Sequence, residues 1–305
     1  MPKPPPLPAD HTVYHAVERL GRWPVGQAYQ GHAQPGGPCT ILFPEIVGAA
    51  IGPFISTFAD EVARNRLLAD LPVIGARHIG LDTKRRPFVV LPLTAGPDLE
   101  TLVHHSGPLS PLAALQIGVQ LAEILIPLHE RNRALGELRP WMIRLPAQRD
   151  QRLSILDLGL CRGLFSGLIR PPRPTVYANE AVRAGQRPTA HDDLFALGAV
   201  IYFALTGLPP TGAPPSAHLR LGPFARLIDA AIMQALGGEG PEPIGTMSQL
   251  AHHLRGLRDL HRLSPVARIV ALRQHGEQPN QPPRLPGTQP LPGGLLGFVE
   301  ALRNA

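Results

Sequence analysis

The sequence predicts an α+β fold of two lobes, in which a small strand-rich lobe precedes a larger helical one. Residues 11–94 have mainly strand-like patterns and are interrupted by one helix, whereas residues 95–262 contain long segments with helical periodicity. A proline-rich lead, 1–10, comes before the first lobe. After the second lobe, the end of its last helix and a Pro-, Gln- and Gly-rich linker are expected over 263–294, followed by a short helix over 295–305.

Two short apolar runs in the first lobe, Thr40–Phe43 and Phe88–Leu91, are typical of buried strands. Between them, Phe58–Leu68 places apolar and small residues at helical spacing, which predicts one helix. The polar run Lys84–Pro87 predicts a turn leading into the second strand, as in a hairpin.

The second lobe is expected to be helical. A long helix is predicted over 110–128, because Ser110 suits the N-cap position and a proline follows it directly. A second apolar helix spans 193–205 and ends at Gly207. Two more helices are expected over 222–236 and 246–258.

The composition excludes several classes of protein. The chain has 305 residues, 44% of them hydrophobic, which excludes wholesale disorder. No uninterrupted apolar window of about 18 residues occurs, so no membrane span is expected, and the first residues lack the apolar core of a signal peptide. Cys39 and Cys161 stand far apart and predict neither a disulfide framework nor a zinc site, which fits a cytoplasmic protein.

The charge balance is basic and almost entirely due to arginine. The net charge is +6, and of 29 basic residues only Lys3 and Lys84 are lysine. A basic chain can bind nucleic acid. However, no run of basic residues interleaved with aromatic ones occurs, so nucleic acid is not an expected partner.

Five short motifs follow one another along the chain. They are a glycine-containing turn at 21–29, Gly-Glu-Leu-Arg-Pro-Trp-Met-Ile at 136–143, Ile-Leu-Asp-Leu-Gly-Leu at 155–160, Tyr-Ala-Asn-Glu at 177–180, and Asp-Asp-Leu-Phe-Ala-Leu-Gly at 192–198 with Thr-Gly-Leu-Pro-Pro behind it. In order, spacing and lobe pattern, this series resembles the eukaryotic-like serine/threonine protein kinases of bacteria over about residues 12–260. The resemblance implies a two-lobed protein-kinase-like fold.

The glycine turn of the family has three glycines and closes over the phosphates of ATP. Gly21 and Gly26 match the first and the third, and would bind the cofactor if a nucleotide binds. The middle position is Trp23, followed by Pro24. An indole would crowd the phosphates and proline removes a backbone donor, so a plain hairpin turn is the favoured interpretation.

The lysine that grips the phosphates in the family has no equivalent in this chain. The resemblance places Phe43 at its position, or Leu42 if the register slips by one residue. Ile41 then falls where the family has a small alanine above the adenine, and would fill that space. Glu61 matches the helix glutamate that pairs with the lysine, and Arg22 is a candidate to bind this glutamate or to replace the lysine.

The catalytic loop of the family is altered at two positions. Its aspartate base becomes Glu137, one methylene longer, and its metal-binding asparagine becomes Met142. A thioether is a poor ligand for a hard cation such as Mg²⁺. Asp157 matches the metal-binding aspartate of the Asp-x-Gly motif, and the same residue also suits a strand-to-turn ending.

Two further matches are architectural. Asp193 matches the aspartate that braces the backbone of the catalytic loop, and Glu180 ends the equivalent of the Ala-Pro-Glu motif. The arginine that pairs with this glutamate in the family falls on Pro243, so that ion pair is expected to be lost. Thr175 is expected to be an ordinary loop residue, with acceptance of a phosphate as the alternative.

These substitutions favour a pseudokinase, a catalytically inactive protein of the kinase fold that acts as a binding or regulatory scaffold for a protein partner. Under this hypothesis no cofactor is needed. Two alternatives stay open: a divergent active serine/threonine kinase that uses Glu137 as base and Asp157 for Mg²⁺, and a sensor that binds ATP weakly without transferring phosphate.

Overall fold

The computed structural model describes most of both expected lobes. The described residues are 12–46, 51–93, 96–146, 152–158, 176–211, 231–233, 235 and 244–262, with the side chains of residues 53, 54, 57, 58 and 61 left out. The expectations for 1–10, 263–294 and 295–305, and those for Cys161, Thr175 and Pro243, lie outside the described residues. The predicted domain boundaries therefore stay predictions.

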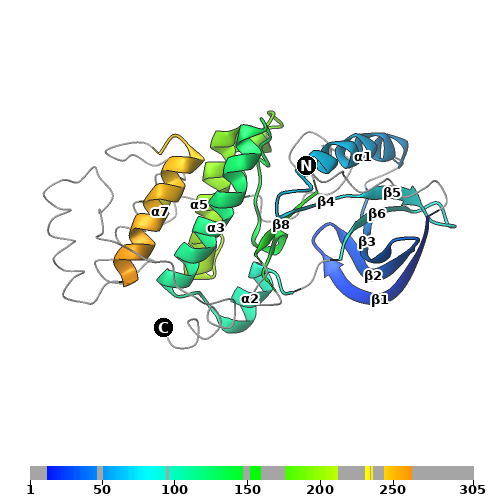
Figure 1. Ribbon diagram of the computed structural model, residues 1–305, viewed down its shortest axis with the longest axis horizontal. Helices are drawn as coiled ribbons and strands as arrows, with labels where there is room; N and C mark the ends of the chain where they lie inside the picture. Colours follow the sequence, from blue (N-terminus) through cyan, green and yellow to red (C-terminus); the bar gives the residue numbers. More distant parts are fainter. Residues whose placement is uncertain are drawn as a thin grey trace, which may run out of the picture.

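The strand-rich lobe contains a five-stranded antiparallel sheet in the order β1-β2-β3-β6-β5 (Figure 1). Its strands are β1 (Val13–Trp23), β2 (Gly26–Gln34), β3 (Gly37–Pro44), β5 (His78–Leu81) and β6 (Pro87–Pro92). The two strands predicted at 40–43 and 88–91 lie within β3 and β6, so both predictions are confirmed.

One helix covers this sheet, as the sequence predicts. It is α1 (Ile51–Asn65), continued by the single turn η1 (Arg66–Leu68), and it begins earlier than the predicted 58–68. Figure 1 shows α1 lying over the sheet, and it contacts β5. Through Val62, this helix also reaches the apolar cluster between the lobes.

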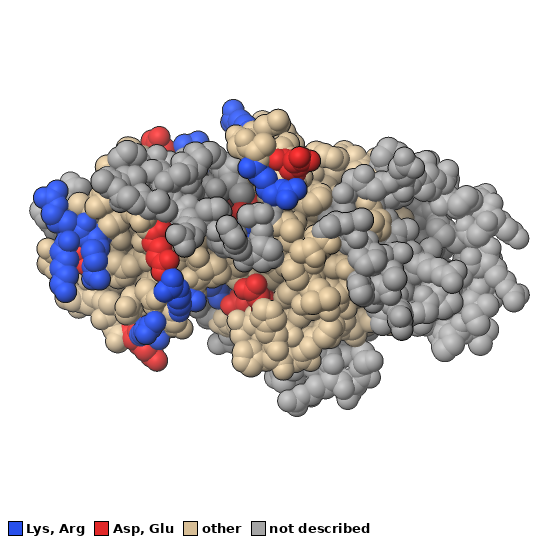
Figure 2. Space-filling model, turned by 180° about the vertical axis from the view of Figure 1, so that it is seen from behind, with Lys and Arg blue, Asp and Glu red and all other residues tan. Residues whose placement is uncertain are grey.

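The predicted turn before β6 is also present. The carboxylate of Asp82 accepts hydrogen bonds from the backbone amides of Lys84 at 2.9 Å and Arg86 at 2.7 Å, which closes the turn. The side chain of Arg86 forms an ion pair of 2.7 Å with the same carboxylate. Figure 2 shows that basic side chains gather at the outer end of this lobe.

The helical lobe is built on three long helices that pack side by side (Figure 1). They are α3 (Pro111–Glu130), α5 (Ala190–Thr206) and α7 (Met247–Arg262), with the shorter α2 (Leu99–Ser106) and α4 (Glu180–Arg183) beside them. These long helices confirm the predictions for 110–128, 193–205 and 246–258. Of the helix predicted over 222–236, only residues 231–233 and 235 are described, and they are helical.

The ends and contacts of these helices follow from local chemistry. The hydroxyl of Ser110 accepts a hydrogen bond of 3.3 Å from the amide of Ala113, so it caps α3 as predicted. Gly207 ends α5 in the left-handed conformation, with φ of 72°. A Cβ atom on Gly118 would lie 2.8 Å from Cδ1 of Ile201, so this glycine lets α3 and α5 approach closely.

A second, smaller sheet joins the two lobes. In it, β4 (Val73–Gly75) pairs in parallel with β8 (Ser154–Asp157), which pairs antiparallel with β7 (Ile143–Arg144). The turn η2 (Pro140–Met142) precedes β7 directly. This sheet therefore places Ile143, at the end of one motif, directly beside Ile155, at the start of the next.

Among the described residues, α3 is the one helix that is long and apolar enough to cross a membrane. It is also the central helix of the helical lobe, and its side chains Leu115, Leu121 and Leu125 are fully buried. Its apolar character is explained by this packing.

Candidate functional site

Three of the sequence motifs, those at 21–29, 136–143 and 155–160, contribute side chains to one apolar cluster between the lobes, which we call the interlobe cluster. Strands β2, β3, β6 and β8, helix α1 and the turn η2 contribute to it, with partly buried side chains such as Trp23 packed against it. Its buried members are Val25, Ala28, Leu42, Val62, Ala76, Val89, Leu91, Trp141, Met142, Leu156 and Leu158.

Trp23, at the end of β1, reaches across from the glycine turn to the helical lobe. Its ring centroid lies 6.5 Å from that of Trp141, with the two ring planes tilted by 44°. The guanidinium of Arg144 lies 4.6 Å from the centroid of Trp23, which is a cation–π contact. The position of the family's middle glycine is therefore occupied by a side chain that joins the two lobes.

Arg144, which the sequence analysis did not single out, is held in place beneath this ring. It is buried, and its Nη1 lies 3.4 Å from Oδ2 of Asp98, the N-cap residue of α2. Burial lowers the pKa of Arg144, and the neighbouring Asp98 carboxylate opposes that shift. The guanidinium of Arg144, which is paired with Asp98, therefore packs against the ring of Trp23.

The two glycines that match the family have different surroundings. Gly26 pairs with Trp23 across the β1–β2 turn, and a Cβ atom there would lie 2.1 Å from the carbonyl oxygen of Phe43. Gly26 is therefore required by the close approach of β3. Gly21 has φ of 133° beside an irregularity in the β1–β2 register, with open space around its Cα. These positions fit the predicted hairpin turn.

The structure decides between the two registers considered for β3. Leu42 is buried in the interlobe cluster and pairs with Ala28 and Val89. Phe43 lies on the opposite face of the sheet, where its ring packs edge-on against Tyr29 at 5.8 Å. The placement of Phe43 at the lysine position is therefore wrong, and Leu42 takes that position in the slipped register.

The expectation for Ile41 is wrong for the same reason. Ile41 is buried in the outer cluster with Cys39 and Val90, away from the helical lobe. Side chains alternate between the two faces of a strand, so the one-residue slip moves Ile41 and Phe43 together. Ile41 and Phe43 therefore lie outside the interlobe cluster, whereas Trp23 packs against it.

Arg22 does not reach the interlobe cluster. It is exposed, and its Nη2 forms an ion pair of 2.5 Å with Oε1 of Glu45 on the surface. Glu61 lies on α1, but its side chain is outside the described part of the structure. The next residue, Val62, is buried in the interlobe cluster, and Ile55 of the same helix packs against it.

Glu137, at the position of the family's base, is buried and paired. Its Oε1 forms an ion pair with Nη2 of Arg139, and the two side chains are 7% and 3% exposed. Met142, the last residue of the turn η2, is buried in the interlobe cluster and fills space beneath the loop. Its thioether is a poor ligand for a hard cation, and the Glu137 carboxylate is paired with Arg139.

Asp157, at the position of the family's metal ligand, faces away from this cluster. Its Oδ2 accepts a hydrogen bond of 3.1 Å from Nη2 of Arg133, which also donates 2.8 Å to Oδ1 of Asn65 on α1. Leu156 and Leu158, on either side of it, both pack into the interlobe cluster. The described residues therefore do not assemble an oxygen-rich site for Mg²⁺, and no cluster of three His, Cys, Asp or Glu side chains occurs among them.

Asp193 takes the bracing position that the resemblance implies. Its Oδ1 accepts hydrogen bonds from the amides of Leu135 at 3.0 Å and Gly136 at 2.6 Å, and its Oδ2 lies 2.7 Å from Nε2 of His129. The side chain is 1% exposed. Helix α3 and the loop at 135–136 thus both contact one buried carboxylate of α5, which fixes the loop that carries Glu137.

The Tyr-Ala-Asn-Glu motif is held by its asparagine. Asn179 caps α4 by accepting a hydrogen bond of 2.9 Å from the amide of Val182, and its amide nitrogen donates to Asp192 of α5. Glu180 is exposed at the first turn of α4 and forms no ion pair among the described residues. Burial raises the pKa of Tyr177, and the Glu100 carboxylate raises it further.

The lobes, the helix order and the bracing Asp193 define the fold of a protein kinase. The chain superposes with a TM-score of 0.58 on the kinase domain of PknI from Mycobacterium tuberculosis, at 17% identity over 80% of this chain and 96% of that chain. It superposes equally well, at 0.58, on Rad53 in complex with AMP-PNP, at 18% identity over 79% of this chain and 64% of that one.

Its sequence relatives are bacterial serine/threonine-protein kinases. The chain is 28% identical over 218 residues to PknK of Mycobacterium tuberculosis H37Rv, covering 67% of this chain and 19% of the relative. It is 27% identical over 262 residues to AfsK of Streptomyces coelicolor, covering 80% and 32%. The chain thus spans about a fifth to a third of the length of these relatives, and no family model matches it.

Proposed function

We propose that this chain is a catalytically inactive protein of the kinase fold that acts by binding a protein partner. The observation that carries the proposal is Trp23, which lies on Arg144 and beside Trp141 between the lobes. In the family, the glycine turn covers the phosphates at this place. An indole bound there by a buried cation competes with a nucleotide for the same space.

The charges around this tryptophan support the same proposal. Phosphoryl transfer depends on positioned charges that neutralise the transferring phosphate. Here Leu42 stands where the family has its lysine, and the carboxylate of Glu137 is paired with Arg139. A carboxylate that is buried against a guanidinium is poorly placed to accept a proton from a substrate hydroxyl.

The proposal also includes a class of binding partner and a cellular location. A protein that keeps a well-packed kinase fold without its charges retains surfaces for binding. We propose a protein partner that contacts the helical lobe or the proline-rich tail, in the cytoplasm.

A thermal-shift titration with ATP and with ADP, each with and without Mg²⁺, tests the proposal. We expect no metal-dependent rise in melting temperature, because a ligand stabilises the folded state only if it binds that state. Rad53, whose structure holds AMP-PNP, is a suitable positive control. A stabilisation of about 2.7 kcal/mol that requires Mg²⁺, as a nucleotide at about 100 times its Kd produces, would contradict the proposal.

The second candidate function is a divergent active serine/threonine kinase. It is favoured by the curated relatives, which are named serine/threonine-protein kinases, and by the presence of carboxylates at Glu137 and Asp157. Autophosphorylation with radiolabelled ATP tests it, with Asp157→Ala and Glu137→Gln as variants. Phosphate incorporation that both variants abolish supports this candidate. Nucleotide binding without incorporation would instead indicate a sensor.

A further inference from the structure

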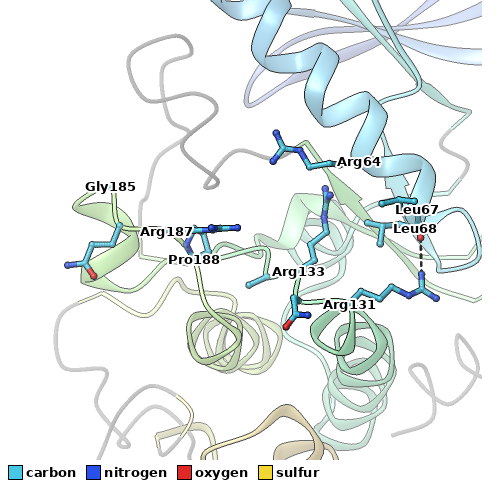
Figure 3. A pocket seen from close by; sticks show the side chains of 11 residues that line it. Arg64, Leu67, Leu68, Arg131, Arg133, Gly185, Arg187 and Pro188 are labelled. Atoms are coloured by element: carbon cyan, nitrogen blue, oxygen red, sulfur yellow. Dashed lines mark hydrogen bonds between the residues drawn. The ribbon is translucent and has the colours of Figure 1, made fainter.

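A cavity of about 600 Å³ lies beside the end of α1 (Figure 3), and none of its described lining residues belongs to the interlobe cluster. Three segments surround it: the end of α1 with η1, the turn that follows α3, and the loop between α4 and α5. Its lining residues are Arg64, Leu67, Leu68, Arg131, Asn132, Arg133, Ala134, Gly185, Gln186, Arg187 and Pro188. We call it the arginine pocket.

The described lining of the arginine pocket contains four arginines and no carboxylate. Two of these arginines have acidic partners. Arg131 binds both carboxylate oxygens of Asp70, at 2.7 and 2.5 Å, and Arg133 binds Asp157 at 3.1 Å. Because these carboxylates balance their charges, Arg131 and Arg133 give the pocket shape and hydrogen-bond donors but no net charge.

The other two arginines leave a positive charge in the pocket. Arg64 and Arg187 are exposed, and neither has an ion pair with any described residue. The Nε of Arg64 donates 3.3 Å to the carbonyl oxygen of Asp60, which orients its guanidinium without neutralising it. Figure 3 shows the side chains of Arg64, Arg133 and Arg187 directed toward a common space. Two uncompensated charges therefore converge from α1 and from the loop before α5.

We propose that the arginine pocket binds a phosphoryl group carried by a larger molecule. Guanidinium groups match phosphate oxygens with paired hydrogen bonds, and two of them balance the two negative charges of a phosphate monoester. A volume of about 600 Å³ is that of a ligand site rather than of a single bound ion. The proposal does not depend on whether the chain transfers phosphate, because none of its lining residues belongs to the interlobe cluster.

Isothermal titration calorimetry of the full chain with inorganic pyrophosphate tests the site. The double variant Arg64→Gln/Arg187→Gln is expected to bind at least about tenfold more weakly than the unmodified chain, since hydrogen bonds to charged groups are individually strong. The matched control is Lys84→Gln/Arg85→Gln at the β5–β6 turn, which removes the same charge elsewhere and is expected to bind as the unmodified chain does.

Two further arms identify the source of the phosphoryl group. One compares ADP with adenosine, and the other compares a phosphothreonine peptide with its unphosphorylated form. Affinity that requires the phosphate and falls in the Arg64→Gln/Arg187→Gln variant supports the proposal, and the better ligand names the source. Because Trp23→Ala alters only the interlobe contact, this variant is expected to keep the affinity.

Three results would overturn the proposal. They are no detectable binding of any of the phosphorylated probes, an equal loss of affinity in the two double variants, and equal binding of the phosphorylated and unphosphorylated forms. An equal loss would show that the net charge of the chain attracts the anion without a specific site. Both altered arginines are exposed, so circular dichroism is expected to show the same melting temperature for variant and unmodified chain.

Discussion

Arg133 donates a hydrogen bond of 3.1 Å to Asp157, and the same nitrogen donates to Asn65 of α1. One guanidinium thereby connects the turn after α3, the end of β8 and the helix that covers the strand-rich lobe. In the family that the chain resembles, the aspartate of this motif holds the metal. Here it is bound on the side of α1, while Leu158 takes the side of the interlobe cluster.

Replacing Arg133 is therefore expected to destabilise the fold. Its side chain is 11% exposed and that of Asp157 is 2% exposed, so Arg133→Gln leaves a buried carboxylate without its guanidinium. Loss of one partner from a buried ion pair costs about 3–5 kcal/mol. Urea denaturation measures the change in the free energy of unfolding.

A neighbouring arginine provides a matched control. Arg131 also pairs with an aspartate, Asp70, but the two side chains are 36% and 64% exposed. Water screens an exposed ion pair, so Arg131→Gln is expected to lower the free energy of unfolding much less than Arg133→Gln does. Equal losses in the two variants would show that burial is not what makes the Arg133–Asp157 pair important.

The contact between Trp23 and Arg144 is expected to hold the lobes together. Trp23→Ala removes an aromatic side chain that is partly buried, together with its cation–π contact, so we expect a loss of about 2 kcal/mol. Denaturant unfolding measures it. Val17→Ala on the same strand is the control, since Val17 is 72% exposed and its truncation is expected to cost less than about 0.5 kcal/mol. Similar losses would contradict the bridging role of Trp23.

Glu137 and Arg139 are expected to be coupled energetically. Each single variant, Glu137→Leu or Arg139→Met, removes one member of this buried ion pair and should cost about 3–5 kcal/mol. The double variant replaces both charges by apolar groups, and is expected to lose less than the sum of the two. A double-mutant cycle measures this coupling. Strictly additive losses would mean that the two charges are stabilised independently.

The parts of the fold that carry a local signal were predicted from the sequence. Ser110 and the proline after it mark the start of α3, and Gly207 marks the end of α5. The runs inside β3 and β6 are apolar enough to identify them as strands. The order of the motifs then predicts the kinase fold, and Asp193 takes the bracing position that the resemblance implies.

The sequence does not predict which face of β3 is turned toward the helical lobe. Thr40–Phe43 is apolar on both sides, so no alternation shows which side chains face the helical lobe, and a slip of one residue exchanges the faces. The parallel pairing of β4 with β8 was missed because both strands are very short and distant in sequence. Arg133 and Arg144 gave no signal among so many arginines, and only the structure shows which acids they bind.

Stability is expected to fall with acidification through His78. This residue packs against both Tyr14 and Phe88, with ring centroids at 5.2 Å from the first and 6.3 Å from the second. Burial lowers the pKa of His78 below its usual 6.5. Between the lowered pKa of His78 in the folded chain and its usual pKa of 6.5 in the unfolded chain, only the unfolded chain binds the proton. Stability therefore rises with pH through this window and is lost as pH falls.

The free energy of unfolding is measured for the unmodified chain and for His78→Phe, and the difference between them is followed with pH. The series runs from pH 8 to pH 5, which is roughly the range in which histidine titrates. Phenylalanine keeps an aromatic ring beside Tyr14 and Phe88 but cannot bind a proton. The difference is expected to be constant above pH about 7 and to shift in favour of the variant below about 6.5. A difference that stays flat over the whole range would show that His78 accepts its proton as easily in the folded chain as in the unfolded one.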